Sequence, residues 1–193
     1  MATPVLHLLA GPNGAGKTTF FEKILHPATG LPFINADRIA QLRWPEHPAA
    51  HAYEAAREAA EIRRRLIEER RSFVTETVFS HPSKLDLLRR AGAAGYQRIL
   101  YGILIPEELA VQRVLVRVRT GGHDVPEEKI RGRFRRLWRL IRQAIALVED
   151  AEILDNSRAK TPFRLVARYH QGELLGSASW PLWTPPELLE TLL

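Results

Sequence analysis

The sequence predicts an α/β fold, a three-layer sandwich in which helices cover both faces of a mostly parallel central sheet. Short apolar runs alternate with longer segments of helical periodicity, which is the pattern of βαβ units. A glycine-rich segment at residues 11–19 joins the first apolar run to the first helical segment. A loop of this kind between a strand and a helix is typical of the P-loop NTPase type of sandwich. We expect one domain over residues 1–193.

The strands are expected where apolar or β-favouring runs are bounded by turn residues. These runs are residues 5–9, 32–35, 72–79, 97–105 and 151–154, and a C-terminal hairpin pairs 163–169 with 173–177. Proline and glycine at 27–32 predict a loop before the second strand. In the appendage 171–193, we expect Trp180 and Trp183 to pack back on the body.

The helices are expected between these strands. Their ranges are 18–25, a short helix from 38 that Pro45 ends, 49–70, 81 to about 92, 107–119, 126–149 and a closing helix at 185–193. Residues 49–70 are rich in Ala, Glu and Arg, which are strong helix formers, and Tyr53, Ala56, Ala60 and Ile67 are available for one face. A Gly-Gly loop between two arginine-bearing helices predicts a helical lid at about 113–142.

Composition limits the class of protein and of partner. The chain has 45% hydrophobic residues, no cysteine and a formal net charge of +6. The lack of cysteine excludes disulfides, thiolate metal sites and thiol nucleophiles. No apolar run approaches the ~20 residues that cross a bilayer, so we expect a cytoplasmic protein without membrane contact. The positive charge suits an anionic partner, although most arginines of a helix face are simply solvated.

The glycine-rich segment matches the phosphate-binding pattern G-x-x-x-x-G-K-[ST] in full. Its residues are Gly11, Pro12, Asn13, Gly14, Ala15, Gly16, Lys17, Thr18 and Thr19. Glycines allow successive main-chain N–H groups to face a polyphosphate, and the following helix adds its positive end. We expect Lys17 to bind the β- and γ-phosphates and the Thr18 hydroxyl to hold a metal ion. The pattern therefore predicts ATP and Mg²⁺.

Two acidic residues follow predicted strands, at the edge of the sheet where ligands bind in open parallel sheets. Asp37 is our candidate for the general base that accepts the proton of an acceptor hydroxyl. A competing interpretation is that Asp37 only caps the helix that begins at residue 38. Glu76, with Thr77 beside it, is expected to bind the acceptor or a Mg²⁺-bound water. No run of four apolar residues followed by Asp supplies a second metal carboxylate.

Arginines near the Gly-Gly loop form the third candidate group. Arg117 and Arg133 are expected to stabilise the charge that develops during phosphoryl transfer, with Arg119 and Arg131 as reserves and Arg131 as a nucleotide contact. His123 is a candidate acceptor contact, although a lone loop histidine often has no such role. Asn156 is a candidate for the adenine pocket, and a plain turn at 155–157 is the alternative.

These segments together resemble the zeta toxin family of P-loop kinases, in order, from residue 6 to residue 157. The matching residues are 11–19, 35–37, 75–77, 117–118, 121–126, 133–134 and 155–157. The resemblance implies ATP-dependent phosphorylation of the 3′-hydroxyl of the amino sugar in UDP-N-acetylglucosamine or a related UDP-sugar. An antitoxin protein is a candidate partner, although toxicity and an antitoxin do not follow from the resemblance. The resemblance also implies that Asp37 is the base, that Lys17 binds phosphates and that lid arginines stabilise the transferred group.

The sequence departs from the family pattern on the second lid helix. Gly132 stands where relatives often carry a further arginine, and Leu140 stands where an asparagine is usual. Two other functions stay open from the residues alone: a nucleotide-dependent binding switch, and a kinase for another small alcohol or a polynucleotide end. The basic segments lack interleaved aromatic residues, which disfavours nucleic acid.

Overall fold

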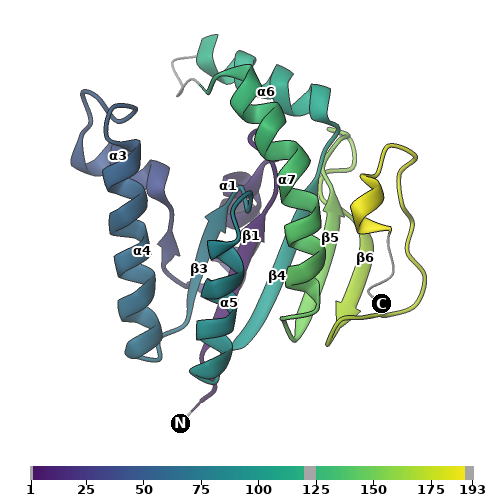
Figure 1. The fold of residues 1–193 in the computed structure, drawn as a ribbon, viewed down its shortest axis with the longest axis horizontal. Coiled ribbons are helices and arrows are strands. Elements are labelled where there is room, and N and C mark those ends of the chain that lie inside the picture. The colour runs from purple at the N-terminus through teal and green to yellow at the C-terminus, as the bar shows by residue number, and fades with distance from the viewer. Residues whose placement is uncertain (1, 120–124, 190–193) are drawn as a thin grey trace.

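The computed structural model describes residues 2–119 and 125–189. They form a seven-stranded sheet in the order β2-β3-β1-β4-β5-β6-β7. The first five strands run parallel, and β6 pairs antiparallel with both β5 and β7. The strands are β1 (Val5–Ala10), β2 (Phe33–Ile34), β3 (Phe73–Thr77), β4 (Gln97–Leu104), β5 (Asp150–Asp155), β6 (Arg164–His170) and β7 (Glu173–Leu174). The predicted mostly parallel sheet with a C-terminal hairpin is confirmed (Figure 1).

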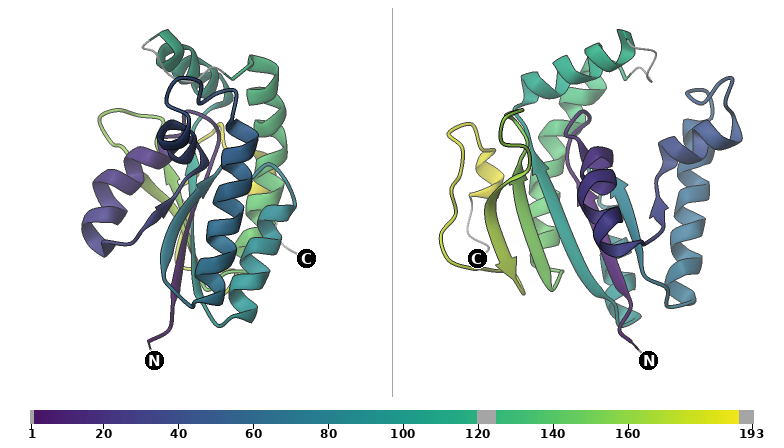
Figure 2. Two further views of the ribbon diagram at one scale, coloured as in Figure 1. Left: turned by 90° about the vertical axis from the view of Figure 1, so that its left-hand side faces the viewer. Right: turned by 180° about the vertical axis from the view of Figure 1, so that it is seen from behind.

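Helices cover both faces of the sheet, which confirms the three-layer sandwich. α4 (Ala52–Glu68), α5 (Ser83–Ala93) and α7 (Glu127–Ile145) lie on one face, and residues 17–29 lie on the other (Figure 2). α6 (Glu107–Arg119) crosses the end of the sheet and packs on α7, as an arginine-bearing lid would. None of the helices in the described ranges is long and apolar enough to cross a membrane.

Strand β1 shows why the core has two parts. Its side chains alternate between the faces, so Leu6 and Leu8 join the larger apolar cluster under α4, α5 and α7, while Leu9 joins the cluster under residues 17–29. Phe73, Leu88 and Trp138 lie in the first cluster. Trp180 and Trp183 pack against the same cluster, as predicted for the C-terminal appendage.

The helix after the phosphate loop is longer than predicted. It runs through α1 (Lys17–Phe20), a π-helical turn η1 (Phe21–Leu25) and α2 (His26–Thr29), and it ends at Gly30 with φ 63°. The prediction of a loop from Pro27 onward is therefore wrong. A π turn widens the helix next to the position where the proline ring and its missing N–H would otherwise disturb an α-helix.

Helix α4 presents a different face from the one predicted. Ala55, Ala59 and Leu66 are its buried residues, whereas Tyr53 is 75% exposed. The small alanines let α4 lie close to α3 (Ala36–Arg43) and to β2. This close packing sets the rotation of α4 about its own axis. At the C-terminus, a 3₁₀ turn η2 (Pro186–Leu188) stands in place of the start of the predicted helix, and residues 190–193 lie outside the described residues.

The register of the sheet brings the predicted site residues to one edge. Ala10 of β1 lies beside Thr77 of β3, and Ile34 of β2 lies beside Thr75. The segments that leave β1, β2 and β3 therefore start at nearly the same level. The phosphate loop, Asp37 and Glu76 meet at this edge.

Candidate active site

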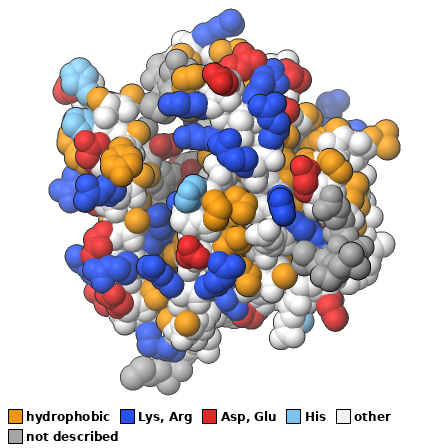
Figure 3. Space-filling model, in the orientation of Figure 1, with side chains coloured by type: hydrophobic (Ala, Val, Ile, Leu, Met, Phe, Trp, Pro, Cys, Tyr) orange, Lys and Arg blue, Asp and Glu red, His pale blue; other side chains and the backbone are white. Residues whose placement is uncertain are grey.

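A pocket of about 570 Å³ lies at the carboxyl end of the parallel strands. In the space-filling view, basic side chains gather along the side of a hollow that α6 and α7 face (Figure 3). The predicted site residues that line the pocket are Asn13, Gly14, Gly16, Lys17, Thr18, Thr19, Asp37, Glu76, Thr77, Arg117 and Arg133. The structure thus brings together most of the residues that the sequence singled out.

The phosphate loop is held by side chains that bind its main-chain carbonyls. Lys17 Nζ donates to the carbonyl oxygens of Gly11 and Pro12, at 3.0 Å each. Asn156 Nδ2 donates to Ala15 O at 2.8 Å from behind the loop. These bonds fix the carbonyls away from the pocket, which leaves loop N–H groups for an anion.

Gly16 can only be a glycine in this loop. Its φ is 91°, in the left-handed region, and a Cβ there would lie 2.5 Å from Asn156 Nδ2. Both the positive φ of the loop and the space that the Asn156 side chain needs therefore require glycine at position 16.

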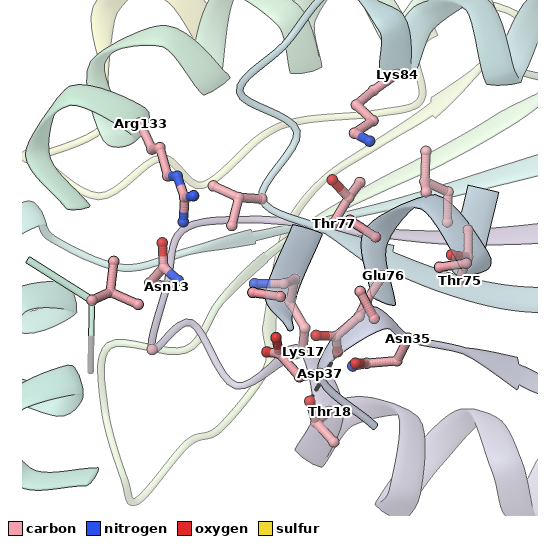
Figure 4. Close-up of a pocket in the computed structure, with 18 of the residues that line it drawn as sticks. Asn13, Lys17, Thr18, Asn35, Asp37, Thr75, Glu76, Thr77, Lys84 and Arg133 are labelled. Atoms are coloured by element: carbon pink, nitrogen blue, oxygen red, sulfur yellow. Dashed lines mark hydrogen bonds between the residues drawn. The ribbon is translucent and has the colours of Figure 1, made fainter. Parts of the chain in front are cut away.

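The loop also contains a polar atom without a partner. Asn13 Oδ1 is buried and has no hydrogen bond within the described part of the chain, and the side chain lies in the pocket below Arg133 (Figure 4). An amide can turn over and offer its NH₂ group instead. The loop conformation, Lys17 and this amide together fit a polyphosphate.

Lys17, Asp37 and Glu76 share the floor of the pocket (Figure 4). Burial lowers the pKa of the Lys17 ammonium, and the charges of Glu76 and Asp37 oppose this shift. Burial raises the pKa of the Glu76 carboxyl, and the charge of Lys17 opposes this shift. A cation and two carboxyl groups thus interact in a partly dry site, where electrostatic effects on a bound ligand are strong.

Thr18 and Glu76 offer adjacent oxygen atoms. Thr18 Oγ1 donates to Glu76 Oε2 at 2.9 Å, so the helix after the loop is linked to the end of β3. Hydroxyl and carboxylate oxygens suit a hard cation such as Mg²⁺. No cluster of three or more His, Cys, Asp or Glu residues that could hold a metal occurs in residues 2–119 and 125–189. The further ligands of a Mg²⁺ ion here would be phosphate oxygens and water molecules.

Asp37 is not the helix cap. Asn35 is the N-cap of α3, and its Oδ1 accepts from the Arg38 N–H at 3.0 Å. Asp37 lies in the first turn, one position inside the helix, and its side chain faces the pocket. The interpretation of Asp37 as the helix cap is therefore wrong, because Asn35 caps the helix.

Arg131 and Asn156 do not line the pocket, and neither do Gly11, Pro12 and Ala15 of the loop. Arg131 forms ion pairs with Glu108 at 2.6 Å and with Glu127 at 2.8 Å, and these link α6 and α7. Asn156 supports the loop and does not line the pocket. His123, with the rest of 120–124, lies outside the described residues.

Three further basic residues line the pocket that the sequence did not single out: Arg63, Lys84 and Arg113. Arg113 donates to Gly14 O at 3.2 Å and to Asn156 O at 2.9 Å, and so it is a second support of the loop. Arg63 follows Ala52, Ala56 and Ala59 at helical spacing along the pocket side of α4. That stripe of small residues was a signal available in the sequence.

Comparison with known proteins identifies the family. The family model described as Zeta toxin matches residues 1–163, which is most of the chain. The chain belongs to the zeta toxin family. The family resemblance inferred from the motifs is thereby confirmed.

Solved structures agree with this zeta toxin assignment in fold. The AvrRxo1-ORF1:AvrRxo1-ORF2 complex, solved with sulphate ions, has a chain that is 19% identical with a TM-score of 0.72, and the match covers 90% of this chain and 61% of that one. The same complex solved with ATP has a TM-score of 0.71 at 20% identity, and the match covers 90% and 60%. This chain therefore spans about three fifths of the length of those chains.

Two further relatives are more distant or uncharacterised. A structure from the PezAT chromosomal toxin–antitoxin system of Streptococcus pneumoniae is 17% identical with a TM-score of 0.64, and the match covers 86% of this chain and 72% of that one. An uncharacterized protein of Haemophilus influenzae is 27% identical over 125 residues, which are 64% of this chain and 88% of that protein. Neither adds an activity.

Proposed function

We propose that this protein is an ATP-dependent kinase that transfers the γ-phosphate to a hydroxyl of UDP-N-acetylglucosamine or a related UDP-amino sugar. Family membership supports the kinase class. The single observation that carries the proposal is the position of Asp37 in the pocket beside Lys17 and opposite the loop. On this proposal, residues 1–193 act as one kinase domain.

The residues divide the work as phosphoryl transfer requires. Lys17, Asn13 and the loop N–H groups hold the phosphates, and Thr18 with Glu76 provides oxygens for Mg²⁺, which would offset phosphate charge when bound. Asp37 orients the acceptor hydroxyl and takes its proton. Arg117 and Arg133 face the same pocket from the two lid helices and stabilise the charge on the transferred group.

The test uses γ-labelled ATP, Mg²⁺ and a panel of UDP-sugars, nucleosides and oligonucleotides. We expect label on a UDP-amino sugar. Asp37→Ala should keep ATP binding and lose transfer by at least ~10²-fold, the lower range for a general base. The matched control is Asp150→Ala, which removes a carboxylate that pairs with His170 at the start of β5, outside the pocket, and should leave transfer unchanged. Normal transfer by Asp37→Ala would contradict the role of this residue.

We further propose an antitoxin protein as partner. The support is family membership and the toxin–antitoxin system from which the PezAT structure comes. A candidate antitoxin that binds this chain should suppress phosphoryl transfer. Its co-expression should also restore the growth of cells that express this chain. Growth that is unaffected by expression of the active chain would contradict a toxic role.

A further inference from the structure

Arg38 follows Asp37 on α3, but Arg38 does not line the pocket. Successive residues of an α-helix point about 100° apart, so the Asp37 carboxylate can face the pocket while the Arg38 side chain turns to a different neighbour. The Arg38 main-chain N–H donates to Asn35 Oδ1, the cap of the helix, at 3.0 Å. The residue next to the candidate base is thus fixed at its main chain and reaches a second element with its side chain.

Three contacts with neighbouring elements hold the Arg38 side chain. Arg38 Nη2 donates to Glu22 Oε1 in an ion pair. The guanidinium carbon lies 5.0 Å from the centre of the Phe33 ring of β2 and 5.6 Å from the centre of the Phe21 ring. These two rings are stacked, with their centres 3.9 Å apart. Phe21 and Glu22 are the first two residues of the π turn η1, so a side chain of α3 binds the helix whose first turn carries Lys17.

An arginine suits this junction because its guanidinium group is planar. A plane can lie against an aromatic ring while its edge donates to a carboxylate, so these contacts fix the direction of the side chain as well as its distance. An exposed ion pair alone contributes little, and the Arg38 side chain is 39% exposed. The contact with the buried Phe21 ring therefore carries much of the link.

The other contacts of α3 tie it to α4. The helix packs chiefly on α4, and Arg43 in its last turn forms an ion pair with Glu58 of α4. These contacts do not set the distance from α3 to the phosphate loop. Arg38 does, because Phe21 and Glu22 belong to the continuous helix that begins at the loop. A misplacement of about 1 Å can cost about 10²-fold in rate, so this distance matters for a base.

We propose that Arg38 is a positioning residue, which holds the Asp37 carboxylate at a fixed place relative to the phosphate loop. This inference rests on the proposed function, in which Asp37 is the general base. On this proposal, Arg38 touches neither the nucleotide nor the acceptor. It acts through Asp37, since its contacts with Phe21 and Glu22 tie the first turn of α3 to the helix after the loop.

The test is a double-mutant cycle in the labelled-ATP assay, with an acceptor that the wild type phosphorylates. Arg38→Met should lower kcat about 10- to 100-fold and change the Kd for ATP less than about twofold, because the loop itself is intact. In an Asp37→Ala background, Arg38→Met should lower kcat less than about twofold further, since a residue that acts through Asp37 then has nothing to position. A purely structural role predicts the same fold loss in both backgrounds, and that outcome would overturn the proposal.

Two further variants separate position from charge. Burial raises the pKa of the Glu76 carboxyl, and the Arg38 charge is among the charges that oppose this rise. Arg38→Lys keeps this charge but loses the planar contact with the rings, so we expect it to recover only part of the loss, and full recovery would overturn the positioning role. Arg43→Met, which removes an exposed ion pair of the same helix, should change kcat less than about threefold. A loss as large as that of Arg38→Met would also overturn the proposal.

Crystal structures test the positional claim without turnover. Wild type and Arg38→Met are each crystallised with a non-hydrolysable ATP analogue and Mg²⁺. We expect the Asp37 carboxylate to be displaced or disordered in the variant only, and an ordered carboxylate in its wild-type place would overturn the role of Arg38. If the wild type labels no acceptor, the proposed kinase function is contradicted, and these structures still decide whether Arg38 holds Asp37.

Discussion

The two ends of the pocket are built from different parts of the chain. At the loop end, the shape comes from main-chain atoms, and Lys17, Asn156 and Arg113 donate hydrogen bonds to the loop carbonyls. At the α4–α5 end, the shape comes from Arg63 and Lys84, with one long hydrogen bond between Arg63 and Thr75. The loop end is held by its own hydrogen bonds, whereas Arg63 and Lys84 at the α4–α5 end form no ion pair with a carboxylate in the described part of the chain.

This difference separates two tasks of a kinase. A polyphosphate is the same in every reaction, so a rigid main-chain site can serve it. The acceptor differs between kinases, and a site made of side chains on two helices can change by single substitutions. We therefore expect substitutions at the loop end to affect nucleotide use and those at the α4–α5 end to affect acceptor choice.

The largest expected effect is at the loop end. Arg133→Met should lower kcat about 10³-fold, because an arginine that stabilises the transferred phosphoryl group contributes at least this much. Steady-state kinetics with saturating acceptor would measure it. Arg131→Met is the matched control on the same helix and should change kcat less than about threefold, since Arg131 is engaged with glutamates outside the pocket. A large effect of Arg131→Met would restore it as a site residue.

A smaller effect is expected where the loop is supported from behind. Asn156→Ala removes the hydrogen bond to Ala15 O and should raise the Kd for ATP about tenfold, the scale of one buried hydrogen bond whose partner is left unpaired. The KM for the acceptor should stay within twofold. Titration with a fluorescent nucleotide measures the Kd for ATP, and acceptor kinetics measure the KM for the acceptor. An equal change in the two constants would contradict a division of nucleotide and acceptor binding between the two ends of the pocket.

The smallest expected effect is on stability at the α4–α5 end. The pKa of Lys84 lies below its ordinary value of 10.5, so between these two values the folded state binds fewer protons than the unfolded state. The free energy of unfolding therefore rises with pH across that window. Lys84→Met should remove this contribution to the rise and should be more stable than wild type at pH 7, within about 1 kcal/mol.

Urea unfolding at pH 7 and pH 10 measures this prediction. The difference between the two proteins isolates Lys84, because the other titrating groups are present in both. If Lys84→Met is less stable than wild type at pH 7, the Lys84 ammonium does not lower the free energy of unfolding and the prediction is wrong.

The contrast between the ends also explains what the sequence could predict. The loop residues 11–19 are contiguous, so their pattern can be read without knowing how the helices pack. Asp37 and Glu76 follow strands, and parallel strands end at a common edge. These local signals were sufficient for the sheet, the loop and the acids that line the pocket.

Arg63 and Lys84 could not be found from strand ends, although the stripe of small residues on α4 was a weaker signal for Arg63. Each lies on an arginine- or lysine-bearing helix, and only the rotation of that helix against the sheet decides which cation faces the pocket. The rotation of α4 was predicted wrongly, with Tyr53 on the buried face, because alanine packing and not bulk sets it. Arg113 was missed for a related reason, since its partners Gly14 and Asn156 are far away in sequence.

The sheet has a last property that bears on solubility. Its outermost strands, β2 and β7, have only two residues each, while the strands between them have five to eight. Unpaired main-chain groups on a long border strand invite pairing with another molecule and the growth of aggregates. Here β2 and β7 offer few such groups, and the Ser179 N–H donates to Val166 O on the part of β6 that β7 leaves uncovered, which disfavours edge-to-edge joining of two sheets.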